Sequence, residues 1–112
     1  HGHPPPGQFG ANLDLGHWHA YSRAALEDWF EALGERLVSL HIHDNRGQAD
    51  EHLPLGAGTL PWREVFALLA RHGGPAQWTL ENLGAEDVLR SLAFLARESG
   101  IAEFARLARS AP

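Results

Sequence analysis

Three short apolar segments, each ending in side chains that can bind a metal, constrain the fold of this chain more than any other feature. Residues 11–15, 37–43 and 77–81 have the length and composition of buried strands. Segments of helical length separate them, so hairpins are disfavoured, and the strands are expected to pair in parallel through right-handed crossovers. Parallel α/β units gather functional groups at the carboxyl ends of their strands. The sequence therefore predicts one shared site at one edge of a parallel sheet.

Helical patterns fill the spaces between and after these strands. Helices are expected over residues 22–34, 59–72, 85–100 and 101–109. Ser22 can cap the first of them, and Gly34 can end it. Residues 1–8 are interpreted as an extended lead-in or linker, and residues 9–109 as three βα units with a C-terminal helix.

Composition excludes several classes of protein. The 112 residues, 44% of them hydrophobic, suffice for one globular unit and are too few for two domains. No apolar run approaches the ~20 residues that span a bilayer, and no targeting signal is visible, so we expect a cytoplasmic protein without a membrane partner. The formal charge of −5 has the wrong sign for a surface that must neutralise many phosphates, which makes nucleic acid an unfavourable partner.

The absence of cysteine limits the metal chemistry open to the chain. Any metal must be held by nitrogen and oxygen, so zinc, manganese, magnesium and cobalt all stay possible. His41, Asp50 and His52 lie within twelve residues, in a segment whose turn residues can fold them together. A single loop histidine usually ligates nothing, but this loop is longer than most and the cluster favours a site. For Asp14, inside a predicted strand, both a hydrogen-bonded structural role and a ligand role stay open.

The motifs at the three strand ends resemble one known superfamily. They are Leu13-Asp14-Leu15-Gly16-His17, then His41-Ile42-His43-Asp44-Asn45 with the following residues 50–58, and then Leu80-Glu81-Asn82. In order and spacing they are similar to the last three βα units of the xylose-isomerase-like TIM barrels, which include sugar-phosphate isomerases and epimerases and endonuclease IV. The resemblance covers about residues 9–100. It implies that residues 1–112 are a partial TIM-barrel domain, the C-terminal portion of a (β/α)8 barrel.

The resemblance also assigns roles to residues. It implies a divalent metal held by Asp14, His41 and Glu81, with Glu81 as the catalytic base and His17 as a further catalytic or ligand residue. A second metal is implied at His17, Asp50 and His52. We expect the substrate, a small sugar or sugar phosphate, to contact Trp18, His43 and Arg46.

The favoured function is therefore a divalent-metal-dependent isomerase or epimerase that acts through an enediolate. The family barrel has eight strands in about 250 residues, whereas this chain supplies about three, and the partner glutamate of the family would lie before residue 1. We therefore expect the chain alone to be inactive and to pair with copies of itself or with the rest of a barrel. Two alternatives stay open: an endonuclease IV-like phosphodiester hydrolase, and a non-catalytic partial barrel.

Overall fold

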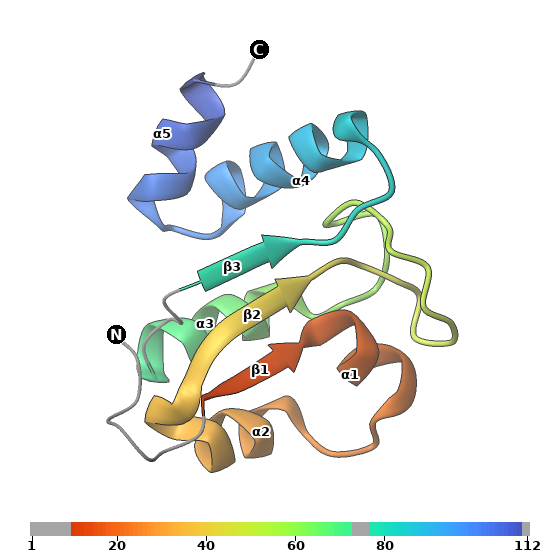
Figure 1. The fold of residues 1–112 in the computed structure, drawn as a ribbon, viewed down its shortest axis with the longest axis vertical. Coiled ribbons are helices and arrows are strands. Elements are labelled where there is room, and N and C mark those ends of the chain that lie inside the picture. The colour runs from red at the N-terminus through yellow and green to blue at the C-terminus, as the bar shows by residue number, and fades with distance from the viewer. Residues whose placement is uncertain (1–9, 73–76, 111–112) are drawn as a thin grey trace.

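The computed structural model describes residues 10–72 and 77–110, so the lead-in predicted over 1–8 lies outside the described residues. The strands β1 (Ala11–Asp14), β2 (Leu37–Ile42) and β3 (Gln77–Leu80) form a sheet in the order β1-β2-β3 (Figure 1). Both neighbouring pairs run parallel. The predicted parallel α/β arrangement is confirmed.

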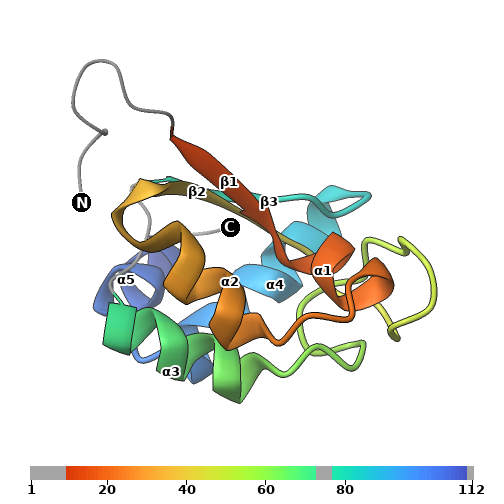
Figure 2. The same ribbon diagram turned by 90° about the horizontal axis from the view of Figure 1, so that it is seen from below.

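Helices cover one face of this sheet. The helices of the described residues are α1 (Leu15–Tyr21), α2 (Leu26–Leu33), α3 (Trp62–His72), α4 (Ala85–Glu98) and α5 (Ala102–Ser110), with a short 3₁₀ turn at Gly34–Arg36 after α2. Figure 2 shows α2, α3 and α4 beneath one face, while no helix of the described residues lies over the other. None of the described helices is long and apolar enough to cross a bilayer.

Burial alternates over the last three residues of β2 and separates the two faces of the sheet. Leu40 and Ile42 are fully buried and belong to the core that the strands share with α2 and α3, where Phe30 and Val65 are also buried. Since successive side chains of a strand point to opposite faces, the partly exposed His41 points to the uncovered face. The covered face therefore holds the apolar core.

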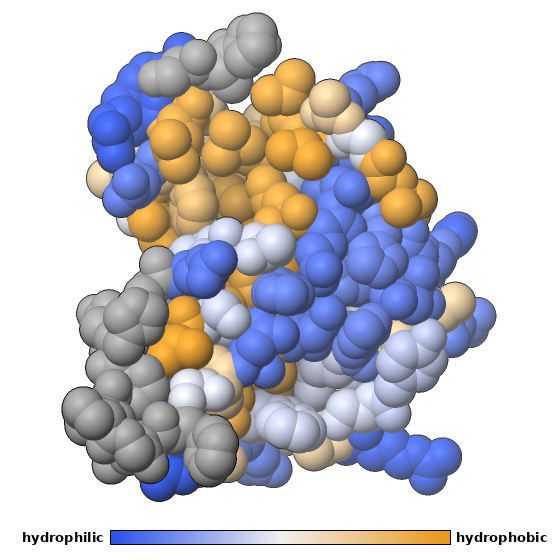
Figure 3. Space-filling view, in the orientation of Figure 1, coloured by the Kyte–Doolittle hydropathy of each residue, from blue (hydrophilic) through white to orange (hydrophobic). Residues whose placement is uncertain are grey.

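The uncovered face is polar beside β1 and β2. Asn12 pairs in register with Ser39, and the Ser39 hydroxyl donates a hydrogen bond of 2.8 Å to Asn12 Oδ1. Asp14 pairs in register with His41, which in turn pairs with Thr79 of β3. Figure 3 shows polar side chains gathered over the ends of the strands and apolar ones beside α4 and α5. The polar face and the strand ends together form the region where the site was expected.

The first helical region differs from its prediction. Leu15, expected in the first strand, instead begins α1, because the Asp14 side chain caps the helix by accepting a hydrogen bond of 2.9 Å from the backbone N–H of His17. Ser22 does not cap α2. Its backbone N–H bonds to Trp18 at the end of α1, and its hydroxyl accepts from the backbone N–H of Ala24 at 3.1 Å. The helix predicted over 22–34 is therefore shortened to α2, whereas α3, α4 and α5 closely follow their predictions.

Candidate metal centre

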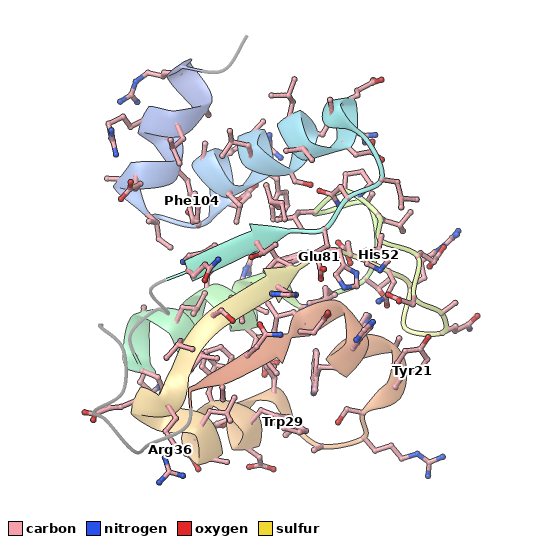
Figure 4. All side chains as sticks on the ribbon, in the orientation of Figure 1. Tyr21, Trp29, Arg36, His52, Glu81 and Phe104 are labelled. Atoms are coloured by element: carbon pink, nitrogen blue, oxygen red, sulfur yellow. The ribbon has the colours of Figure 1, made fainter. Side chains whose placement is uncertain are left out.

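The carboxyl ends of the three strands bring the predicted ligands to one edge of the sheet. Asp14 is the last residue of β1, and His41 lies opposite it in β2. Glu81 follows β3 directly, and its backbone N–H donates to the carbonyl of Ile42 at 3.0 Å. The Nδ1 atom of His41 lies 3.1 Å from Glu81 Oε1. Figure 4 shows Glu81 and His52 close together at this edge.

A first group of potential ligands contains Asp14, His43 and Glu81, with one ligand atom of each within 4.8 Å of the others. The two carboxylates are those that sequence reasoning named. The imidazole in the group is that of His43, however, while His41 contacts Glu81 alone among the predicted ligands of this metal. Two imidazoles, those of His41 and His43, are therefore candidates for the nitrogen ligand beside the carboxylates of Asp14 and Glu81.

A second group contains His17, His43, Asp50 and His52, again with one ligand atom of each within 4.8 Å of the others. The Nε2 atoms of His17 and His52 each lie 3.0 Å from a different oxygen of Asp50. Sequence reasoning had named three of these four residues. His43 belongs to both groups. The sequence signal for this is that His43 comes two residues after His41, and side chains two residues apart in an extended segment point to the same side.

The loop that carries Asp50 and His52 is folded back by Asp44. The buried Asp44 carboxylate accepts four hydrogen bonds of 2.8–3.1 Å, from the backbone N–H groups of Asn45, Gly56 and Leu60 and from Trp62 Nε1. Its backbone also exchanges hydrogen bonds of 2.9 and 2.8 Å with Leu53. Four donors satisfy both carboxylate oxygens, so burial of this charge is compensated.

A second polar network fastens the loop to α4. Asn82 donates to the carbonyl of Leu53 at 2.9 Å and accepts from the Ser91 hydroxyl at 2.7 Å. The same hydroxyl accepts from the backbone N–H of Leu55 at 3.0 Å. Because Ser91 is fully buried in α4, the position of the loop beside His52 depends on this helix.

The groups of the centre shift one another's pKa. Burial raises the pKa of Asp14, but hydrogen bonds from His43 and from the backbone of His17 outweigh it and lower that pKa to about 2. Burial likewise raises the pKa of Asp50, and hydrogen bonds from His17 and His52 bring it below its usual range. The hydrogen bond to Asp50 raises the pKa of His17. Two ionised carboxylates therefore face the imidazoles at neutral pH, which favours a bound cation.

The residues expected to contact substrate lie in three different environments. Trp18 donates its Nε1–H to the carbonyl of Ala24 at 2.9 Å and lines a pocket of about 400 Å³ beside β1. Arg46 is exposed and pairs with Glu51. His43 is fully buried. Trp18 therefore lines the same pocket as His17, whereas the guanidinium of Arg46 forms an ion pair with Glu51 in the loop.

Gly16 was not singled out by sequence reasoning, yet it makes room for His43. A Cβ atom at this position would lie 1.9 Å from His43 Cε1, which is far inside any permitted contact. The carbonyl of Gly16 also accepts a hydrogen bond of 2.8 Å from Asn45 Nδ2, which ties α1 to the loop. The signal of Gly16 in the sequence is its place between Asp14 and His17, two residues that meet in the centre.

The chain belongs to the xylose isomerase-like TIM barrel family, which it matches over residues 3–101. Among solved structures it is similar to a D-tagatose 3-epimerase-like protein, with a TM-score of 0.69 and 26% sequence identity. That similarity covers 90% of this chain and 36% of the other. The three-stranded sheet is therefore part of a TIM-barrel fold.

Similar sequences include uncharacterized proteins from an archaeon and a mycobacterium. Protein MJ1311 of Methanocaldococcus jannaschii is 31% identical over 83 residues, which are 73% of this chain and 28% of that protein. Protein Rv0498 of Mycobacterium tuberculosis is 40% identical over 101 residues, which are 88% of this chain and 34% of that protein. The chain thus spans about a third of the length of these relatives.

Proposed function

We propose that the chain is the metal-binding part of a sugar isomerase or epimerase whose substrate is a small hydroxy-carbonyl sugar or its phosphate. The observation that carries this proposal is the meeting of Asp14 and Glu81 with imidazole nitrogens at the carboxyl ends of parallel strands. Membership of the xylose isomerase-like family and the similarity to a D-tagatose 3-epimerase-like protein support it.

The donor atoms fit a divalent cation held by oxygen and nitrogen. Asp14, with its pKa lowered to about 2, is ionised at neutral pH. Glu81 adds a second carboxylate, and His41 presents Nδ1 at 3.1 Å from it. We assign Asp14, His41 and Glu81 to one cation, since the Nε2 atom of His43 is already 2.8 Å from Asp14 Oδ1. Zinc, manganese, magnesium and cobalt all accept such a set.

In this proposal Glu81 removes the proton from the carbon that lies between the carbonyl and hydroxyl groups. The enediolate that results is protonated on the neighbouring carbon for isomerisation or on the opposite face for epimerisation. When bound, a divalent cation would polarise the two substrate oxygens and so acidify that C–H bond. His17, half-exposed at the edge of the centre, is placed to contact a substrate oxygen. In the family a second carboxylate comes from an earlier strand, so turnover is proposed for the chain joined to earlier strands of a barrel.

The test combines the 112-residue chain with the N-terminal remainder of the mycobacterial relative and a divalent metal. Mass spectrometry then measures incorporation of solvent deuterium into ketoses, which reports proton exchange at carbon whichever product is formed. Glu81→Gln should reduce the exchange rate by about 10²–10⁴-fold, as removal of a general base does. Glu98→Gln, at an exposed carboxylate of α4, is the matched control and should leave the rate unchanged. Exchange that survives both Glu81→Gln and chelation of the metal would refute the proposal.

The second candidate, a phosphodiester hydrolase, is supported by one observation. His17, Asp50 and His52 form a further ligand group, as a multi-metal hydrolase would require. The charge of −5 and the pairing of Arg46 with Glu51 leave little to attract DNA. Cleavage of an abasic duplex by the same reconstituted barrel, without deuterium exchange into ketoses, would favour this candidate.

A further inference from the structure

The ring of His43 is held in a fixed position at the centre. Its side chain is fully buried, and its ring stacks on that of His52 with the centroids 3.9 Å apart and the planes 4° from parallel. Gly16 leaves the space beside the ring, since a Cβ there would lie 1.9 Å from His43 Cε1. Packing thus leaves this imidazole little freedom to turn.

The buried ring donates a hydrogen bond to one oxygen of Asp14. Nε2 of His43 lies 2.8 Å from Asp14 Oδ1, and because an ionised carboxylate can only accept, Nε2 carries the proton. The backbone N–H of His17 donates to the same oxygen at 2.9 Å. A carboxylate has about two lone-pair positions on each oxygen, so these two donors fill Oδ1.

The second oxygen of Asp14 has no such donors. Oδ2 lies 3.5 Å from Nδ1 of the half-exposed His17, which is longer than a normal hydrogen bond. No hydrogen bond to Oδ2 comes from any described residue. The two oxygens therefore differ: Oδ1 is occupied within the fold, and Oδ2 is the one with lone pairs to offer a cation.

His43 itself is badly oriented to bind an ion. The lone pair of an imidazole lies in the plane of the ring, so two parallel rings 3.9 Å apart cannot both direct their lone pairs at one ion. His43 therefore does not share an ion with His52. Its Nδ1 atom lies 3.8 Å from Asp50 Oδ1, beyond hydrogen-bond distance, and has no hydrogen-bond partner among the described residues.

We infer that His43 is a positioning residue, whose Nε2–H acts with the backbone N–H of His17 to hold Asp14 Oδ1 and so leave Oδ2 for the cation. The inference deepens the proposed function, on which it rests for a cation at Asp14, His41 and Glu81. Donors behind metal ligands fix the orientation of those ligands in this way. His43 is then neither a ligand nor a contact of the sugar, and His41 supplies the imidazole.

Nuclear magnetic resonance of the ¹⁵N-labelled, metal-free chain tests the hydrogen bond without any substitution. At about pH 8, above the ordinary pKa of an imidazole, couplings to the carbon-bound ring protons show which nitrogen carries the proton. In His43 the proton should be on Nε2. A His43 ring with its proton on Nδ1 could not donate to Asp14 as inferred, and the inference would be wrong.

A zinc titration of two variants measures the effect on binding. The ring nitrogens of His41 report on the cation of interest, since His41 lies outside the second ligand group. His43→Gln retains an N–H donor, whereas His43→Leu fills similar space without one. Both variants lose the stacking on His52, so the difference between them isolates the hydrogen bond.

Zinc affinity measured at His41 should fall by about 10–100-fold in His43→Leu and by clearly less in His43→Gln. Equal losses in the two variants, or no loss in either, would overturn the inference. His19→Leu is the matched control, because His19 bonds to Thr59 and belongs to neither ligand group, so its affinity should equal that of the unchanged chain.

A double-mutant cycle separates positioning from a general loss of structure. If the His43 donor acts through Asp14, adding His43→Leu to Asp14→Ala should cause almost no further loss of zinc affinity. A further loss as large as that of His43→Leu alone would show that His43 acts by another route. Circular dichroism confirms that each variant is folded, and the tautomer measurement decides the question if His43→Leu does not fold.

These outcomes can be told apart from failure of the proposed function, because no substrate enters the measurements. His41 nitrogens that do not respond to saturating zinc in the unchanged chain would reject the proposed cation and this inference with it. Zinc binding at His41 that is the same with and without a donor at residue 43 would reject the inference alone. Loss of deuterium exchange with the expected zinc affinities would reject the isomerase and keep His43 as a positioning residue.

Discussion

The absence of a side chain at Gly16 leaves the space that the ring of His43 occupies. A Cβ atom at residue 16 would overlap the ring of His43, and that ring cannot retreat because it is stacked on His52 and bonded to Asp14. We expect Gly16→Ala to lower the free energy of unfolding of the metal-free chain by about 1–3 kcal/mol, as overpacking does. Urea unfolding followed by circular dichroism measures the change. Gly84→Ser is the control, because a Cβ there meets nothing within 4 Å and serine is a favourable N-cap residue for α4, so stability should not fall.

Asp44 supports the centre without belonging to either ligand group. Asp44→Ala would leave the N–H donors of three buried residues unpaired, those of Asn45, Leu60 and the Trp62 ring, and should cost on the order of 3 kcal/mol in the free energy of unfolding. It should also weaken zinc binding, because Asp50 and His52 lie in the loop that Asp44 folds back. Isothermal titration calorimetry with zinc measures that loss. Asp28→Ala, at an exposed carboxylate of α2, should leave zinc affinity unchanged, and equal affinities for the two variants would contradict the role of Asp44.

The lowered pKa of Asp14 predicts an acid-sensitive fold. Burial acts to raise this pKa, but hydrogen bonds from His43 and the backbone of His17 hold it at about 2, below the ordinary value of 3.8. A lowered carboxyl pKa stabilises the folded state above the unfolded value, and this contribution disappears as the pH falls through the folded value. Stability of the metal-free chain should therefore fall between about pH 4 and pH 2. Asp14→Asn should remove this part of the pH dependence, whereas Asp28→Asn should not.

Among elements, the loop before α3 and the helix α4 act as one support. Ser91→Ala removes the hydroxyl that joins Leu55 to Asn82 and leaves both groups without that partner. We expect a loss of about 1–3 kcal/mol in the free energy of unfolding. Hydrogen exchange should show faster exchange of the Leu55 amide in the variant, while amides in β2 exchange at rates set by global unfolding. An unchanged rate at Leu55 would show that the loop does not depend on α4.

The elements also show what sequence can and cannot predict here. The spacing of apolar residues and the length of each segment suffice to predict β2, α3 and α4, because the apolar faces of these elements pack against one core. The segment of α1 has no such pattern, and its helix is set by the cap from Asp14 and by the space that Gly16 leaves for His43. Both effects depend on contacts that the spacing of apolar residues along the chain does not reveal.

The same reasoning applies to the candidate site. The predicted strands were enough to place Asp14 and Glu81 at the same edge of the sheet, since the carboxyl ends of parallel strands lie together whatever their side chains. Which imidazole joins them depends on rotamers at the end of β2, where His41 and His43 share one side of the strand. The role of Asp44 depends on donors up to residue 62, brought together only by the folded loop.

At the scale of the whole molecule, the sheet has two outer strands whose far edges are unpaired within the described residues. β1 and β3 each bond to β2 alone. Parallel strands are normally covered and paired, so such edges favour association. We expect sedimentation velocity of the 112-residue chain to show oligomers that grow with concentration. A single monomeric species at high concentration would contradict this.

The 112-residue chain alone should also lack isomerase activity. In the proposed function Glu81 takes a proton from one face of a substrate carbon, and the resemblance implies that a second carboxylate would come from another strand of the barrel. Deuterium exchange by the chain alone should therefore be at background, and should rise when the remainder of a barrel is supplied. Full activity of the unassisted chain would show that the second carboxylate is dispensable.

The parallel order of the strands also decides which assemblies could work. A twofold axis that joins β1 of two copies turns one sheet end for end, so the two ligand clusters come to lie at opposite rims. Placing β3 of one copy beside β1 of the next keeps every strand pointing the same way and gathers the clusters around a common mouth. A symmetric pair of chains would thus hold two separated ligand clusters, whereas a head-to-tail arrangement would bring the clusters of different copies to one mouth.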